Sequence, residues 1–115
     1  MDAQKTRRWI RLTRELANEI HQTAIDKGWW SGDRNDGELL ALCHSELSEA
    51  LEALRHGNQP DDKIPTYTGA EAELADTIIR ILDMSDARQW DVAGAVIAKM
   101  AMNKTRAHMH GGKKF

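Results

Sequence analysis

The residues from Asp36 to His56 carry the pattern that most constrains the fold, because apolar side chains recur there at helical spacing and one acid falls among them. Projected at about 100° per residue, the segment presents one apolar arc, made of Leu39, Cys43, Leu47, Ala50, Leu51 and Leu54. Glu46 lies inside the edge of this arc, and Glu49 lies just beyond it on the same side. A carboxylate that faces a core is costly unless it is paired or binds a metal. We therefore predict a helix whose inner face meets positive charge.

The rest of the chain also reads as helices. Three further helices are predicted, at about Lys5 to Lys27, Gly69 to Ala87 and Asp91 to His108. Gly28 and Gly57 follow the first two helices as C-terminal stops. No window combines alternating polarity with the β-branched residues typical of a strand. The 115 residues are predicted to form one domain, residues 1–115, that is all-α and resembles a four-helix bundle.

Composition excludes several kinds of protein. The net charge of -2 gives no general attraction to nucleic acid polymers or to anionic membranes. No apolar run reaches the length of a signal peptide or a membrane span. Cys43 is the only cysteine, so neither an intrachain disulfide nor a cysteine zinc cluster can form. We expect a cytoplasmic protein with no membrane and no nucleic acid polymer as partner.

Two pairs of acids, each spaced i, i+3, lie on consecutive predicted helices: Glu46 with Glu49, and Glu73 with Asp76. Acids at this spacing are neighbours on a helix surface and repel each other if they are left unpaired. Four carboxylates from two adjacent helices form an oxygen site that suits Mg²⁺ or Mn²⁺. The alternative is that each pair faces water and is balanced by Arg80 or Arg55.

The last predicted helix carries the opposite charge. Lys99, Asn103 and Arg106 follow one another at i, i+4 and i+7 and therefore share one face. Two cations and an amide on one helix face could bind a polyphosphate. The alternative is that the two cations lie along a packed face with their charged ends in water.

Taken together, these motifs resemble a known family. The stretches "SELSEALEAL" and "ELAD" resemble the Glu-x-x-Glu, spacer, Glu-x-x-Asp signature of the MazG-like nucleotide pyrophosphohydrolases, in the all-α NTP pyrophosphohydrolase superfamily. The ending "KMAMNKTRAHMHGGKKF" and the stretch "DKGWW" are similar to a compact subgroup of that family. One position departs from the pattern, since Ser45 stands where many members have a further Glu.

The resemblance implies Mg²⁺-dependent hydrolysis of a nucleoside triphosphate to the monophosphate and pyrophosphate, for nucleotide pool control, by a dimer or tetramer. It implies metal ligands at Glu46, Glu49, Glu73 and Asp76, with Glu49 or Glu46 also orienting or deprotonating the attacking water. It further implies phosphate contacts from Lys99, Asn103 and Arg106, and from Lys113 or Lys114, presented by the two preceding glycines.

Candidates for contact with the base or the sugar lie near the end of the first helix. The adjacent Trp29 and Trp30 could stack on a nucleobase, and Asn18, His21 and Gln22 could contact the base or sugar. In the alternative interpretation, one Trp belongs to the core, the other fixes the loop, and the polar residues serve the surface or an interface.

Alternatives to this function stay open. The third helix is apolar over most of its circumference, which predicts self-association. The chain could instead be a non-catalytic helical module that binds a nucleotide or a protein, or a phosphoribosyl-nucleotide pyrophosphohydrolase. Four acids converging on a metal would favour an enzyme over a pure interaction domain.

Overall fold

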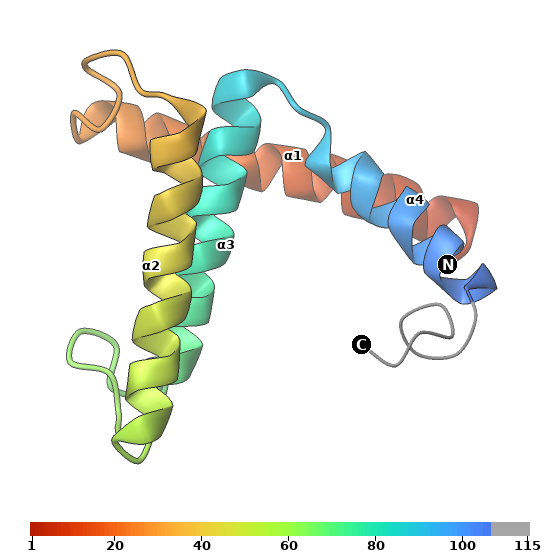
Figure 1. The fold of residues 1–115 in the computed structure, drawn as a ribbon. Coiled ribbons are helices and arrows are strands. Elements are labelled where there is room, and N and C mark those ends of the chain that lie inside the picture. The colour runs from red at the N-terminus through yellow and green to blue at the C-terminus, as the bar shows by residue number, and fades with distance from the viewer. Residues whose placement is uncertain (107–115) are drawn as a thin grey trace.

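The computed structural model describes residues 1–106 as four α-helices packed together, so the prediction of an all-α chain is confirmed for this part of the sequence (Figure 1). The helices are α1 (Ala3–Asp26), α2 (Asp36–Arg55), α3 (Gly69–Arg88) and α4 (Val92–Thr105). The bounds of the first three lie within about two residues of those predicted, and the predicted end of the fourth lies outside the described residues. None of the described helices is both long enough and apolar enough to cross a lipid bilayer.

Each helix begins at a polar side chain that caps its first turn. Asp2, Asn35 and Asp91 accept hydrogen bonds from backbone N–H groups three residues ahead. Thr68 forms a reciprocal capping box with Glu71 at the start of α3. Local sequence therefore sets where the helices start.

The helices form an antiparallel hairpin crossed by a second pair. Figure 1 shows α2 and α3 side by side and α1 crossing them near one end of the hairpin. α4 turns away from the hairpin and lies along the first half of α1, where Trp9 Nε1 donates to the carbonyl oxygen of Ala93 at 3.0 Å. The hairpin is thus covered by α1 on only one side.

The buried core consists mainly of small side chains. On α2 the buried residues are Leu39, Cys43, Glu46 and Ala50. The outer part of the predicted apolar arc is uncovered, since Leu47, Leu51 and Leu54 are 45–57% exposed. The apolar residues Leu74, Ile78 and Ile81 of α3 are exposed as well. The arc predicted from the sequence therefore divides into a face that packs against α3 and a face that the single chain leaves open.

Candidate functional site

Glu46 is buried between α2 and α3, and a cation from the neighbouring helix pairs with it. Its side chain is only 10% exposed, and its Oε1 accepts a hydrogen bond from Nε of Arg80 at 2.9 Å. This contact confirms the expectation that the acid on the inner face would meet positive charge. A charge-assisted bond of this kind offsets part of the cost of burying a carboxylate.

Three of the four predicted ligands come together. Glu46, Glu49 and Glu73 each offer a carboxylate oxygen, and these oxygens all lie within 4.8 Å of one another. We call these three residues the acidic cluster. They meet because the i, i+3 spacing places Glu46 and Glu49 on one side of α2, where α3 packs against it. Asp76 lies one turn further along α3, outside this group.

The carboxylates of the acidic cluster disfavour one another's ionisation, and Arg80 pairs with Glu46 among them. Hydrogen bonding to Glu46, together with burial and the charge of Glu49, raises the pKa of Glu73 to about 8. Burial opposes ionisation of Glu46, but hydrogen bonds with Glu73 and Arg80 lower its pKa overall. Lost hydration and the nearby charge of Glu46 raise the pKa of Asp76. Three carboxylates this close cannot all ionise cheaply unless a cation joins them.

One oxygen atom of the acidic cluster has no partner among the described residues. Glu73 Oε2 is buried and has no hydrogen-bond partner. A buried polar atom without a partner costs free energy that a bound cation would recover. The cluster could therefore hold a metal ion, and its all-oxygen donor set is of the kind that hard divalent cations prefer.

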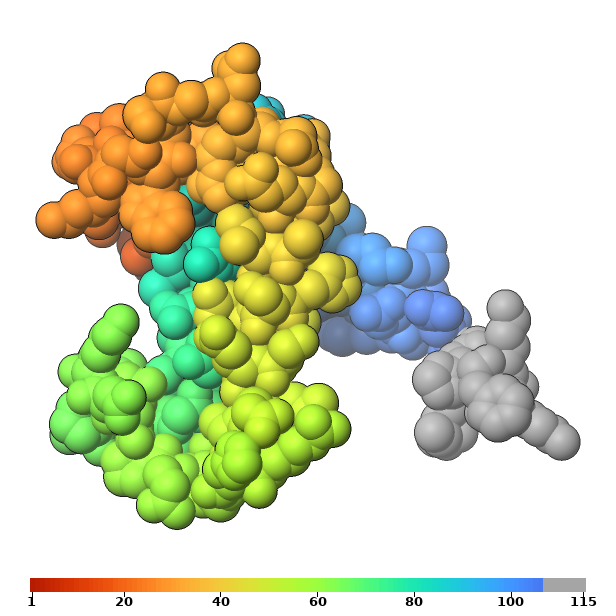
Figure 2. Space-filling view, turned by 60° about the vertical axis from the view of Figure 1, so that its left-hand side comes forward, coloured from red at the N-terminus to blue at the C-terminus, as the bar shows by residue number. Residues whose placement is uncertain are grey.

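A cleft of about 410 Å³ adjoins the acidic cluster. Glu46, Asp76 and Arg80 line it on the side of the hairpin, and Trp29 and Lys63 line it from two different loops. Figure 2 shows the hollow, with the loop before α2 (orange) above it, the loop before α3 (green) below it and α3 (teal) between them. Apolar, aromatic and charged groups all face this space, as is common in sites for small polar ligands.

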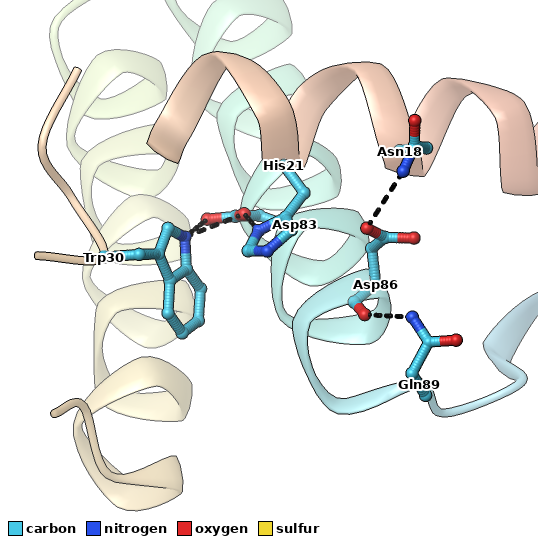
Figure 3. A network of polar contacts seen from close by, with 6 residues as sticks. All are labelled: Asn18, His21, Trp30, Asp83, Asp86 and Gln89. Carbon is cyan, nitrogen blue, oxygen red and sulfur yellow. Dashed lines mark hydrogen bonds and ion pairs between the residues drawn. The ribbon is translucent and has the colours of Figure 1, made fainter. Parts of the chain in front are cut away.

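Trp30 is held by hydrogen bonds beside the cleft. Its Nε1 donates to both carboxylate oxygens of Asp83, at 3.0 and 3.1 Å, and His21 Nδ1 donates to the same carboxylate at 2.7 Å (Figure 3). The guanidinium groups of Arg34 and Arg88 lie over its ring, 5.2 and 5.8 Å from the centroid. These contacts attach the loop after α1 to α3. Trp30 therefore has the role of fixing the loop, which the alternative interpretation of the sequence gave to one of the two Trp residues.

Removing the Nε1 hydrogen bonds of Trp30 should therefore destabilise the fold. We expect Trp30→Phe to lower the free energy of unfolding by about 2 kcal/mol, because a hydrogen bond to a charged partner contributes about that much. Trp29→Phe is the matched control, since Trp29 is 55% exposed and donates no hydrogen bond within residues 1–106. Its effect should stay within about 0.5 kcal/mol. Urea unfolding followed by circular dichroism measures both, and equal losses would contradict this assignment.

Two of the polar candidates of α1, His21 and Asn18, contact α3, and His21 does so at Asp83, which lines the cleft. The third, Gln22, donates to Asp26 on its own helix at 3.2 Å. Figure 3 shows His21 directed at Asp83 and Asn18 directed at Asp86. The Asn18 Nδ2 to Asp86 Oδ2 distance is 3.5 Å, which is at the limit for a hydrogen bond. Both residues thus link α1 to α3 in the single chain.

The candidate phosphate-binding residues of α4 lie apart from the acidic cluster. Lys99, Asn103 and Arg106 are exposed, and α4 follows α1 away from the hairpin (Figure 1). Within one chain the structure does not bring these residues to the acids. Lys113 and Lys114 lie outside the described residues.

The structure adds two residues, Arg80 and Lys63, that sequence reasoning did not select as site residues, and it places Trp29, one of the two tryptophans considered for stacking, in the same cleft. Trp29 lines the cleft, with its ring centroid 5.9 Å from the guanidinium carbon of Arg80. Lys63 reaches the cleft from the loop before α3. Arg80 follows Asp76 at i+4 and therefore shares its helix face, which was a usable signal. Nothing in the sequence distinguishes Lys63 from an ordinary surface lysine.

Comparisons with protein families, with curated proteins and with solved structures give no match for this chain.

Proposed function

We propose that this protein hydrolyses a nucleoside triphosphate to the monophosphate and pyrophosphate, with a divalent cation held by the acidic cluster and Asp76. The observation that carries the proposal is the convergence of Glu46, Glu49 and Glu73 beside a cleft with an aromatic wall. The order of the acidic motifs, which resembles that of the MazG-like pyrophosphohydrolases, supports the same reaction. Mg²⁺ or Mn²⁺ is the cation best suited to these ligands.

A bound divalent cation would neutralise phosphate charge and lower the pKa of a coordinated water. The chain's own residues supply the remaining functions. Glu49 is the exposed member of the acidic cluster, so its carboxylate can be reached by the attacking water, orient it and accept its proton. Trp29 offers an exposed ring on which a planar base can stack.

The test of this proposal is a panel of the eight common nucleoside triphosphates incubated with Mg²⁺ and scored for monophosphate and pyrophosphate. Release of both from at least one nucleotide supports the reaction. Diphosphate and orthophosphate as products would point to a different bond being cleaved. Binding of a nucleotide with no release of product would favour a non-catalytic module.

We propose further that the chain self-associates through the open face of the hairpin. This face is formed by exposed apolar residues of two helices: Leu47, Leu51 and Leu54 of α2, and Leu74, Ile78 and Ile81 of α3. Contiguous apolar surface of this kind is uncommon on a monomer. A partner chain would also offer a way for Lys99 and Arg106 to approach a phosphate chain.

A charge on the open face should therefore break the assembly. We expect Ile78→Glu to weaken self-association at least about 100-fold, because it buries an unpaired carboxylate in an apolar interface. Ile64→Glu is the matched control, since Ile64 is exposed on the loop before α3 and lies outside the face. Sedimentation equilibrium measures both variants. A wild-type chain that sediments as a monomer would contradict the proposal.

A further inference from the structure

The loop before α3 is built to hold Lys63 at the cleft. Asp61 Oδ2 accepts hydrogen bonds from the backbone N–H groups of Lys63 and Ile64, at 2.9 and 3.0 Å. The N–H of Asp61 donates to the carbonyl oxygen of Tyr67 at 2.8 Å and closes the loop. These bonds fix the backbone that carries Lys63, which lines the cleft together with Trp29. Within residues 1–106 its ammonium makes no ion pair.

Arg80 connects the cleft with the acidic cluster. Its Nε donates to Glu46, and its guanidinium lies 5.9 Å from the Trp29 ring centroid. Its side chain remains 28% exposed and lines the cleft. A guanidinium carries five N–H donors, and Nε makes the one hydrogen bond found for Arg80 in the described part of the chain. Its terminal N–H groups are therefore available to a ligand.

We propose that Arg80 and Lys63 are the anion-binding pair of this cleft and take the phosphate group of a ligand whose planar ring lies on Trp29. The proposal rests on the proposed function in one respect, namely that the acidic cluster binds a divalent cation. This assignment places phosphate contacts within one chain, in addition to those expected from α4.

The contact between Arg80 and Glu46 makes the two binding events interdependent. Without a cation, the negative charge of the cluster holds the guanidinium and repels an approaching phosphate. A cation at the acidic cluster would neutralise the charge of Glu46. The attraction between Glu46 and Arg80 would then weaken, and the repulsion between the cluster and the phosphate would disappear. Phosphate and cation therefore bind with positive coupling, and each raises the affinity for the other by the same factor.

The test measures binding without turnover, using Mn²⁺ alone and then each of the eight common nucleoside monophosphates by isothermal titration calorimetry. We expect wild type to bind at least one monophosphate, and to bind it more tightly in the presence of Mn²⁺. Arg80→Gln should lower the monophosphate affinity at least about tenfold, because a charge-assisted hydrogen bond is lost, and should reduce its dependence on Mn²⁺ to the part that comes from repulsion between the acidic cluster and the phosphate.

Two further variants separate binding from folding. Lys63→Gln should lower monophosphate affinity about tenfold and leave the dependence on Mn²⁺ in place. Lys5→Gln, on the exposed first turn of α1, should change neither quantity. Arg80→Gln should bind Mn²⁺ alone at least as tightly as wild type does, since it removes a competing cation. A merely structural role for Arg80 would instead weaken Mn²⁺ binding along with the fold, which thermal unfolding would reveal.

The outcomes distinguish this inference from the function on which it rests. If wild type hydrolyses a triphosphate and binds Mn²⁺, but Arg80→Gln and Lys63→Gln keep full monophosphate affinity, the inference is overturned and the proposed function stands. If no monophosphate binds to wild type, the inference is likewise overturned. If wild type fails to bind Mn²⁺, the inference and the proposed function are both overturned.

Discussion

Replacing Glu49 with Gln is expected to lower the rate of pyrophosphate release at least about 100-fold, which is the usual contribution of a positioned general base. The side chain is exposed and belongs to the acidic cluster with Glu46 and Glu73, so the substitution removes a charge without opening a cavity. The free energy of unfolding should therefore stay at the wild-type value or rise slightly. A coupled pyrophosphate assay and urea unfolding measure the two quantities.

Glu52→Gln is the control for this experiment, because it makes the same chemical change on the same helix. Glu52 is exposed, and its carboxylate pairs with His56 Nε2 at 2.6 Å instead of joining the acidic cluster. The turnover of Glu52→Gln should remain within about twofold of wild type, since an exposed ion pair contributes little to the stability of the fold. Turnover by Glu49→Gln at the wild-type rate would remove Glu49 from the site.

Replacing Glu73 with Gln is expected to weaken binding of Mg²⁺ or Mn²⁺ at least about tenfold, because the number of charged ligands sets the affinity of oxygen sites. The same change should stabilise the metal-free protein at pH 8 or above. The amide keeps the volume of Glu73 and removes the charge that its neighbours disfavour. Calorimetry with the metal alone and thermal unfolding in chelator measure the two effects.

The raised pKa of Glu73 makes the stabilisation of the metal-free protein by Glu73→Gln depend on pH. The folded protein keeps the carboxyl protonated up to pH about 8, whereas the unfolded chain releases the proton near its ordinary value of 4.5. The stability that this proton contributes is fully present below 4.5 and is lost as the pH rises through 8. The stability gained by Glu73→Gln in chelator should therefore grow between pH 5 and 8. A gain that is constant over this range would contradict the raised pKa.

The affinity of wild type for the metal should rise with pH over the range in which Glu73 loses its proton. A carboxylate must lose its proton before it can bind a cation, so the apparent affinity of wild type should rise as the pH approaches 8. In Glu73→Gln this dependence should be much weaker over the same range. Calorimetric titrations at several pH values, in buffers that do not bind the metal, measure both.

The helices and the meeting of the acids could be predicted from the sequence because local rules govern both. Helical periodicity and terminal glycines located α1, α2 and α3. The i, i+3 spacing required each acid pair to share a helix surface, and the inner position of Glu46 required a partner. That partner is Arg80, one of the two cations weighed for it.

The remainder depends on how the helices cross, which periodicity does not encode. The direction taken by α4 follows from the short turn at Gln89, which adopts the left-handed conformation, with a φ of 57°, and ends α3. The roles of the adjacent tryptophans depend on which one reaches Asp83, a residue that is distant in sequence. The position of Lys63 depends on hydrogen bonds within its own loop. The contact of Trp30 with Asp83 is tertiary, whereas the turn at Gln89 and the loop around Lys63 are local conformations, and the sequence pattern alone specifies none of the three.

The central claim, that the acidic cluster supports hydrolysis of a nucleotide to its monophosphate and pyrophosphate, is tested most directly by phosphorus NMR of the products. Wild type and Glu49→Gln are incubated side by side with the best nucleotide of the panel and Mg²⁺, and each again with excess chelator. Wild type with Mg²⁺ should give equal amounts of monophosphate and pyrophosphate, and almost none should form under the other conditions. The same products from Glu49→Gln at the wild-type rate, or no product from wild type with any nucleotide, would contradict it.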